Sequence, residues 1–359
     1  MMNAMREHAS PIPPWQALGD EQVRRWRHVL DTLTRLVPAG PAAIVVDANA
    51  DSAAYPAAVA DRLASALRAV GRACARLTVD TPADEGTWRA KAAAGAVAVA
   101  DGALWRARPP GGRWSLVIWL RTPPGHRHAP VDRPPDADVV IDLHDPAWPV
   151  IRHIGATLAD HELWYLAESR AFFATRAATW DTKFGDDTPA YAAAIAEAAV
   201  PAGATVLDLG CGTGRALPCL CAAVGPAGTV IGVDITEQMI SAAIAHDRAR
   251  LATLVLADAR HLPLTGDSVD VVFAAGLVQH LPDTAAGLAE LARITRPGGQ
   301  LVLFHPSGRS ALAARHGHAL RPDEPLAERP LRAALTDAGF RLHTYDDPPH
   351  RFFAHAVRA

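Results

Sequence analysis

Three alternating glycines that directly follow a short apolar run and an acid form the most informative stretch of the sequence. It reads Val206-Leu-Asp-Leu-Gly-Cys-Gly-Thr-Gly-Arg215. A glycine-rich turn between a strand and a helix presents backbone N–H groups to an anionic ligand. The dinucleotide fingerprint is Gly-x-Gly-x-x-Gly, but here Gly214 comes one position too early and Asp208 precedes the turn. A carboxylate there suits a ligand that carries a cationic group, not a pyrophosphate.

Two further acids end predicted strands downstream. The first strand, 229–234, ends in Asp234, and the second, 254–258, ends in Asp258. Because ligands bind at the carboxyl ends of parallel strands, we expect both acids to lie near Asp208. Asp234 could accept hydrogen bonds from both hydroxyls of a ribose. The alternative for each of the three acids is a purely structural role, such as capping the end of its strand.

The elements that must position these residues follow an α/β pattern. We predict strands over 204–209, 229–234, 254–258, 269–275 and 296–304, with a helix over 216–224 after the glycine-rich turn. A helix then ends at Gly339 and two strands follow, 340–345 and 352–357. This order predicts a mainly parallel sheet that closes with an antiparallel pair.

With these parts in this order, residues 172–345 resemble the class I S-adenosylmethionine-dependent methyltransferases. Val206 to Gly214 resembles their first motif. The resemblance implies a Rossmann-like sheet with an antiparallel closing strand and S-adenosyl-L-methionine as cofactor. It implies ribose binding by Asp234, adenine packing by Met239, and adenine amino-group recognition by Asp258. The implied donor-binding residues are Asp208, Gly210, Gly212, Gly214, Asp234, Ile235, Met239, Asp258 and Ala259.

Two histidines are the candidates for a catalytic base. A sulfonium donor already carries an activated methyl group, so a base is needed only when the acceptor must lose a proton. His280 and its neighbour Gln279 follow the fourth predicted strand of this region, and His305 ends the fifth. An unperturbed histidine, with a pKa near ~6.5, can act as a base at neutral pH. The alternative for His280 is that it packs against or caps the next helix.

The segment before the first strand of this region is rich in aromatic residues. Phe172 to Asp181 resembles the lid helix of these methyltransferases, in which an aromatic residue and an acid close over cofactor and substrate. Trp180 and Phe184 are therefore the lid candidates. The alternative is that these aromatics only bury apolar area at a domain junction.

The first half of the chain has its own α/β pattern. We predict a helix with Asp20 as its N-cap that ends before Pro38, a helix over 57–70, and strands over 42–47, 74–79, 96–100, 115–120 and 137–143. The order of parts resembles the uridine kinase type of P-loop phosphotransferase, which has a parallel sheet. However, Asp47 to Pro56 has neither the glycines nor the lysine of a phosphate loop. We therefore expect a degenerate P-loop kinase-like domain with a structural or oligomerising role.

The 359-residue length predicts two domains. We place a kinase-like domain at 1–153, with 1–19 loose, a helical connector and lid at 154–199, and the methyltransferase domain at 200–359. The net charge of −3 gives no attraction to nucleic acid or anionic membranes. Four cysteines, no signal peptide and no long apolar run predict a cytoplasmic protein. His316 and His318 lack the further ligands of a metal site, so we predict none.

The resemblance implies methyl transfer to a small-molecule acceptor at carbon, oxygen or nitrogen. The loop from Ala274 to His280 lacks the Asn-Pro-Pro-Tyr sequence that is used on planar amino groups. The alternatives are a non-catalytic S-adenosylmethionine-binding scaffold and an enzyme of this fold that catalyses a non-methylating reaction.

Overall fold

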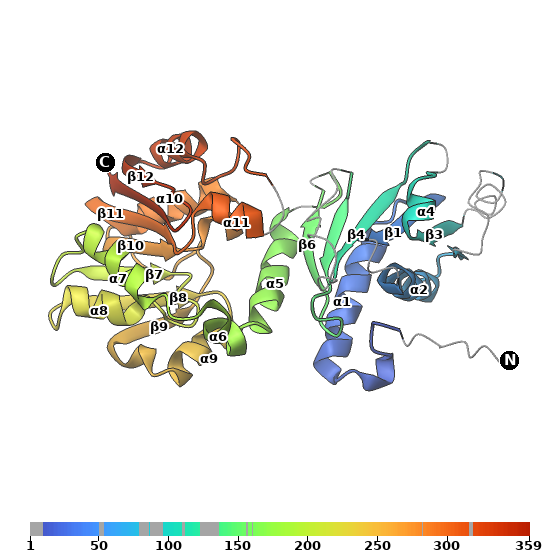
Figure 1. The fold of residues 1–359 in the computed structure, drawn as a ribbon, viewed down its shortest axis with the longest axis horizontal. Coiled ribbons are helices and arrows are strands. Elements are labelled where there is room, and N and C mark those ends of the chain that lie inside the picture. The colour runs from blue at the N-terminus through green and yellow to red at the C-terminus, as the bar shows by residue number, and fades with distance from the viewer. Residues whose placement is uncertain are drawn as a thin grey trace. The chain divides into compact units, whose positions relative to one another are not determined.

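The chain forms two compact units, each with its own sheet. The structure, a computed structural model, describes residues 10–49, 54–78, 86, 96–109, 112–122, 136–155, 157–159, 161–281, 283–315 and 319–359. Tertiary contacts divide the chain into Met1–Trp164 and Tyr165–Ala359 (Figure 1). From Tyr165 onward, the segment expected to be a connector and lid belongs to the C-terminal unit.

The N-terminal sheet has the strand order β2-β3-β1-β4-β5-β6. Its strands are β1 (Ala42–Ala48), β2 (Cys74–Leu77), β3 (Val97–Asp101), β4 (Leu116–Arg121), β5 (Val139–Asp142) and β6 (Val150–Ile154). The first five are parallel, whereas β6 runs antiparallel to β5. The five predicted strands are parallel, and the antiparallel strand β6, which makes the sheet mixed, was not predicted. The link from Asp142 to Val150 is shorter than the crossover of about a dozen residues that a parallel strand needs.

Four helical elements of this unit are described: η1 (Trp15–Ala17), α1 (Asp20–Leu36), α2 (Ala54–Ala69) and α4 (Ala103–Arg106). The apolar face of α1 buries Trp26, Val29 and Leu33 completely, which explains why its 3.6-residue periodicity was readable from the sequence. The N-cap is Gly19, not Asp20, and the backbone N–H of Gly19 donates to Gln22 Oε1 at 2.9 Å.

The C-terminal sheet has the strand order β12-β13-β11-β10-β7-β8-β9. Its strands are β7 (Thr205–Leu209), β8 (Thr229–Asp234), β9 (Ala252–Leu256), β10 (Val269–Ala275), β11 (Thr295–His305), β12 (Phe340–Asp346) and β13 (Phe352–Arg358). Only β13 runs antiparallel to its neighbours, β11 and β12. The chain moves outward in one direction from β7 to β9 and in the other from β10. The carboxyl ends of β7 and β10 therefore form the switch point where ligands bind in such sheets.

Helices cover both faces of this sheet (Figure 1). The helical elements from α5 onward are α5 (His161–Ala174), η4 (Ala177–Thr179), α6 (Trp180–Phe184), α7 (Thr188–Glu197), α8 (Leu217–Val224), α9 (Glu237–Ala245), η5 (Arg248–Leu251), η6 (Val278–His280), α10 (Thr284–Ile294), α11 (Arg309–Arg315) and α12 (Glu328–Asp337). The predicted strands and closing pair are confirmed, with shifts of one or two residues at their ends.

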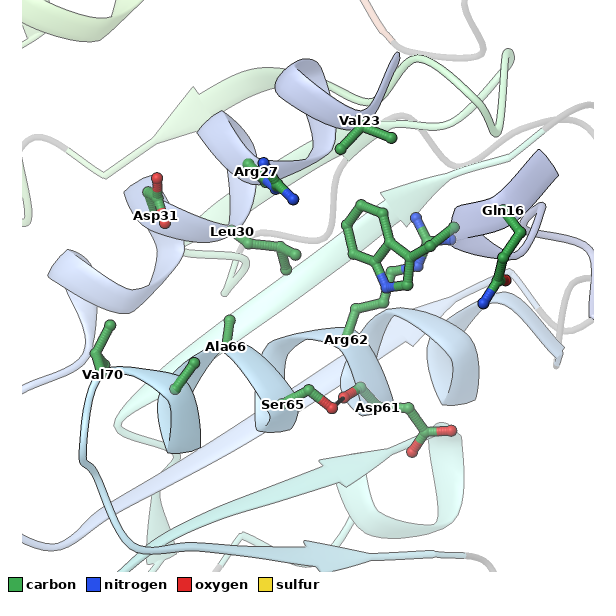
Figure 2. A pocket seen from close by; sticks show the side chains of 12 residues that line it. Gln16, Val23, Arg27, Leu30, Asp31, Asp61, Arg62, Ser65, Ala66 and Val70 are labelled. Atoms are coloured by element: carbon green, nitrogen blue, oxygen red, sulfur yellow. Dashed lines mark hydrogen bonds between the residues drawn. The ribbon is translucent and has the colours of Figure 1, made fainter. Parts of the chain in front are cut away.

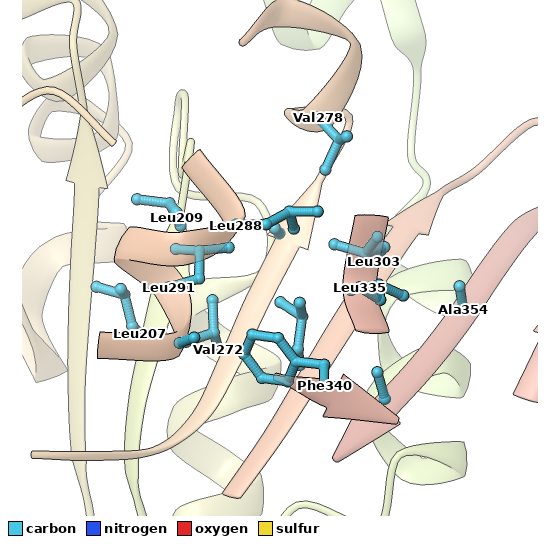
Figure 3. Packing of buried hydrophobic residues seen from close by; sticks show 14 of the residues in the cluster. Leu207, Leu209, Val272, Val278, Leu288, Leu291, Leu303, Leu335, Phe340 and Ala354 are labelled. Atoms are coloured by element: carbon cyan, nitrogen blue, oxygen red, sulfur yellow. The ribbon is translucent and has the colours of Figure 1, made fainter. Parts of the chain in front are cut away.

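Two apolar cores hold strand β7 in place. On one face, Leu207 and Leu209 pack with Leu291 of α10 and Leu335 of α12 (Figure 3). On the other face, Val206 packs with residues of α7 and α8. Full burial of such a side chain contributes about 1.5–3 kcal/mol. The glycine-rich turn thus begins on a strand that is fixed from both sides. Among the described residues, no helix is long and apolar enough to cross a bilayer.

Candidate functional site

The glycine-rich turn joins β7 to α8 and lies against the end of β8. Gly210, Gly212 and Gly214 have positive φ values of 71°, 53° and 80°, a conformation that glycine adopts without a steric cost. The backbone N–H groups of Gly210 and Cys211 donate to Val233 O at 2.8 and 3.0 Å. A β carbon on Gly212 would have no neighbour closer than 4.0 Å, so this part of the turn is open to a ligand.

Asp208 is a buried acid without a complete set of partners. Asp208 is 2% exposed, and its Oδ2 atom has no hydrogen-bond partner among the described residues. Burial, together with the negative charge of Asp234, raises the pKa of Asp208 to about 8. A buried carboxyl group without a partner is costly, and a cationic ligand group would relieve that cost. The residues at this position therefore fit a ligand such as an amino acid with a free ammonium group.

Asp234, the last residue of β8, hydrogen-bonds to the glycine-rich turn. Its Oδ2 accepts the N–H of Gly212 at 2.9 Å, and its Oδ1 accepts the N–H of Thr236 at 2.8 Å. Burial raises the pKa of Asp234, and these backbone hydrogen bonds oppose that rise. The Thr236 side chain and the Ile235 backbone N–H also interact with this carboxylate, so ribose hydroxyls would share its oxygens with protein donors. The ribose role of Asp234 stays a prediction.

Asp258 is bound by an arginine that sequence reasoning did not assign. Arg260 Nη2 lies 2.9 Å from Asp258 Oδ2, and the backbone N–H of Arg260 donates to Oδ1 at 3.0 Å. Burial alone would raise the pKa of Asp258, but the hydrogen bonds and charge of Arg260 outweigh it and lower that pKa. An adenine amino group would therefore share Asp258 with Arg260, and Ala259, the predicted N–H donor, lies between them.

The two remaining donor-site candidates lie beside β8. Met239 on α9 is 2% exposed, so its side chain belongs to the core, and its contact with adenine stays a prediction. The carbonyl oxygen of Ile235 accepts a hydrogen bond of 3.1 Å from Arg170 Nε of α5. Arg170 was not singled out from the sequence, because nothing in the local pattern indicates a partner so far along the chain.

Trp180 and His280, which were predicted for different reasons, meet at a common neighbour. The ring of Phe173 on α5 lies 5.7 Å from the Trp180 ring and 5.3 Å from the His280 ring, edge-on in both cases. Such contacts contribute about 0.5–1.5 kcal/mol beyond area burial. His280 therefore packs against the predicted lid segment. The side chain of Phe184 lies outside the described residues.

His305 and Gln279 meet around Gly276, at the carboxyl ends of β10 and β11. A β carbon on Gly276 would lie 3.4 Å from His305 Cδ2 and 3.8 Å from Gln279 Nε2. His305 Nδ1 lies 2.9 Å from both the backbone N and O of Ser307, so the backbone fixes the imidazole orientation. If Nδ1 carries the proton and donates to Ser307 O, Nε2 is the basic nitrogen.

A groove of about 700 Å³ lies wholly within the N-terminal unit. Figure 2 shows Arg62 and Ser65 of α2 across from Arg27 and Leu30 of α1. The Arg62 guanidinium lies over the rings of Trp15 and Trp26, at 4.4 and 4.2 Å. The groove contains no residue of the glycine-rich turn. Within the described part of the chain, no three His, Cys, Asp or Glu side chains are placed to hold a metal ion; His316 and His318 lie outside it.

Comparisons with known proteins agree with the geometry of the C-terminal unit. Residues 207–303 match the family model of the methyltransferase domain. The chain is 38% identical over 110 residues to methyltransferase GfsG of Streptomyces halstedii, covering 29% of this chain and 38% of that protein. It is 36% identical over 112 residues to a demethylmenaquinone methyltransferase of Lactobacillus johnsonii, covering 30% of this chain and 46% of that protein.

A solved methyltransferase is also similar. It is described as a SAM-dependent methyltransferase from Aquifex aeolicus, with a TM-score of 0.43 and 24% identity over 50% of this chain and 98% of that one. The chain spans less than half the length of the two curated relatives named above. Within the C-terminal unit, residues 207–303 are therefore similar to a methyltransferase domain.

Proposed function

We propose that the protein transfers the methyl group of S-adenosylmethionine to a small-molecule acceptor. The observation that carries the proposal is the buried Asp208 carboxyl, whose Oδ2 has no partner among the described residues and which stands beside a glycine-rich turn held by Asp234. This combination suits a ligand with an ammonium group near one end and a ribose farther along. The match of residues 207–303 to the methyltransferase domain supports the same ligand.

Residues of this chain hold the donor in defined ways. S-adenosylmethionine supplies a methyl group that is activated by the adjacent sulfonium. Asp208 would accept its ammonium group, and backbone N–H groups beyond the glycines would face its carboxylate. Asp234 would accept the ribose hydroxyls, Asp258 the adenine amino group, and Met239 would support the adenine ring from the core. Ile235 and Ala259 complete the predicted set through their backbones.

The acceptor would lie at the carboxyl ends of β10 and β11. Gln279 and His305 meet there around Gly276, and Trp180 and His280 both contact Phe173. We propose His305 as the base for acceptors that lose a proton, because it ends β11 beside Gln279 and the Ser307 backbone fixes the orientation of its ring. The ring cluster of Phe173, Trp180 and His280 favours an apolar or planar acceptor. One relative is named for demethylmenaquinone, a small molecule; for this chain the acceptor atom is carbon, oxygen or nitrogen.

Incubation of the purified protein with radiolabelled donor and a cell extract tests the enzymatic proposal. Label that enters a small organic product supports it. The rival is a scaffold that binds the donor without transferring methyl, and tight donor binding with no labelled product would favour that rival. The acids and glycines of the site are all present, which favours the enzyme.

For the N-terminal unit we propose a structural or oligomerising role and no phosphate transfer. Asp47, at the end of β1, is 5% exposed, and burial raises its pKa. Its Oδ1 accepts the N–H of Ala48 at 2.9 Å, and Arg106 Nε lies 3.9 Å from its Oδ2. An acid where a phosphate loop would begin repels a triphosphate, and no glycine or lysine follows it before Pro56. The kinase resemblance itself remains a proposal.

A further inference from the structure

The short helix α6 is connected to the glycine-rich turn through Asp181, its second residue. Thr213 Oγ1 donates to Asp181 Oδ1 at 2.7 Å, and Arg248 Nη1 lies 2.5 Å from Asp181 Oδ2. Arg248 also donates to the backbone oxygen of Thr213 at 3.0 Å. Asp181, Thr213 and Arg248 thus form a closed triangle, which we call the Asp181 triangle.

Thr213 makes this contact significant because it stands between Gly212 and Gly214. It is 1% exposed, so its hydroxyl is out of water and depends on protein partners. A hydrogen bond between a buried hydroxyl and a carboxylate is stronger than one between neutral groups, because the acceptor is charged. Any movement of α6 away from the turn would leave the Thr213 hydroxyl and the Arg248 charge without their acid.

The electrostatics favour an ionised Asp181. Burial acts to raise its pKa, but the hydrogen bonds from Thr213 and Arg248 and the charges of Arg248 and Arg215 outweigh it and lower the pKa. His246 Nε2 at the end of α9 is a further neighbour, 3.6 Å from Asp181 Oδ2. A second ion pair joins the same two segments, because Arg215 Nη2 lies 2.5 Å from Asp187 Oδ1 and also donates to Gly185 O.

We propose that Asp181 is a positioning residue that couples α6, and with it Trp180, to the conformation of the glycine-rich turn. The proposal rests on the methyltransferase function proposed above and refines it. The resemblance led us to expect an acid of the lid segment that closes on the ligands. Instead, the geometry directs both carboxylate oxygens of Asp181 to the protein, so the acid organises the donor site through Thr213. Donor affinity then depends on Asp181, which does not contact the donor but hydrogen-bonds to Thr213 of the glycine-rich turn.

Four variants of the full chain test this. Asp181→Asn weakens the acceptor for Arg248, and Thr213→Val removes the hydroxyl at nearly constant volume. Thr213→Ser restores the hydroxyl, and the fourth variant combines Asp181→Asn with Thr213→Val. Glu197→Gln is the matched control, because it removes an acid from a surface ion pair elsewhere. In that pair Glu197 Oε2 of α7 lies 2.5 Å from Arg351 Nη1, the same distance as between Asp181 and Arg248. Thermal unfolding of every variant shows whether it is folded.

Two measurements are made on each protein. Titration calorimetry with S-adenosylhomocysteine gives donor-site affinity, and hydrogen exchange without ligand reports on residues 177–187. We expect Asp181→Asn and Thr213→Val each to weaken binding about tenfold, the loss of one charge-assisted hydrogen bond. Both should speed hydrogen exchange in residues 177–187, and Thr213→Ser should keep most of the affinity that Thr213→Val loses. The double variant should bind no more weakly than whichever single variant binds more weakly.

The outcomes separate this proposal from the proposed function. If the unaltered protein does not bind S-adenosylhomocysteine, the methyltransferase proposal fails, and exchange of residues 177–187 alone decides whether Asp181 holds α6. If the unaltered protein binds but Asp181→Asn and Thr213→Val bind equally well, with unchanged exchange, the positioning role is overturned. Equal losses in Glu197→Gln would also overturn it, because they would show a general effect of removing an acid.

Discussion

Asp234, at the end of β8, accepts the backbone N–H of Gly212, the middle glycine of the turn after β7, at 2.9 Å. The second acid and the glycine-rich turn are therefore one structural unit, and a change in either one affects the other. This relationship explains why the turn is ordered next to the buried and incompletely paired Asp208. It also sets the first prediction.

We expect Asp234→Ala to weaken binding of S-adenosylmethionine by tenfold or more, about 1.4 kcal/mol. The substitution removes the acceptor for the ribose hydroxyls and the acceptor for the Gly212 N–H. Asp234→Asn is the matched control, because its remaining oxygen can still accept one of these hydrogen bonds, so its loss should be smaller. Calorimetric titration measures both, and unchanged affinity in Asp234→Ala would refute the ribose assignment.

Donor binding should release a proton near pH 7. With its pKa raised to about 8, Asp208 is mostly protonated at pH 7 without a ligand, and an ammonium group beside it favours the carboxylate. Calorimetry in buffers of different ionisation enthalpy measures the released proton. Asp208→Asn should abolish the release. A wild-type binding heat that does not depend on the buffer would contradict the role of Asp208.

The same pKa makes a stability prediction for the ligand-free protein. A carboxyl group whose folded pKa is above its unfolded value of about 4 favours folding fully only below pH ~4. Its contribution declines as pH rises towards about 8, by at most about 1.4 kcal/mol per pH unit. Denaturant unfolding at several pH values should show a flatter profile in Asp208→Asn. Identical profiles in the two proteins would contradict the raised pKa.

Two glycines of the turn should respond differently to alanine. In Gly214→Ala, the new β carbon would lie 2.9 Å from Leu217 Cδ1 and 3.2 Å from Ala243 Cβ, so we expect the fold to lose about 1–3 kcal/mol. In Gly212→Ala, the nearest atom to the new β carbon would be Gly210 O at 4.0 Å. We therefore expect Gly212→Ala to be the milder change for stability, costing about 1 kcal/mol from backbone strain, while still impeding the donor. Urea unfolding and donor titration measure both effects, and a reversed order would contradict the geometry.

Substitutions of His305 and His280 should have different effects on kcat. His305→Asn should lower kcat about 100-fold for an acceptor that loses a proton, because it removes the proposed base. His280→Phe should change kcat little, since it keeps a ring against Phe173. Steady-state kinetics with the acceptor decides between them. A large loss in His280→Phe together with a small one in His305→Asn would exchange their roles.

The N-terminal unit should not bind ATP with useful affinity, because Asp47 stands at the end of β1 and no phosphate loop follows it. Calorimetric titration of the full chain with ATP and Mg²⁺ tests this expectation. Micromolar binding would contradict it.

The sequence was sufficient for the strands of the C-terminal sheet and for the order of its acids, because buried strands and glycine turns have strong local patterns. It was insufficient for β6, whose direction depends on the shortness of its connection. It also could not predict that Arg260 binds Asp258, or that Asp181 binds Thr213, which lies 32 residues away. The first pair depends on the conformation of the loop after β9, and the second on where α6 lies relative to the glycine-rich turn; local residue patterns determine neither.

Titration of the full chain with S-adenosylmethionine tests the central claim most directly. We predict saturable binding at one site per chain, competition by S-adenosylhomocysteine, and no competition by NAD, since Asp208 and the early Gly214 disfavour a pyrophosphate. Absence of binding, or displacement of the donor by NAD, would contradict the assignment of this turn as a methyl-donor site.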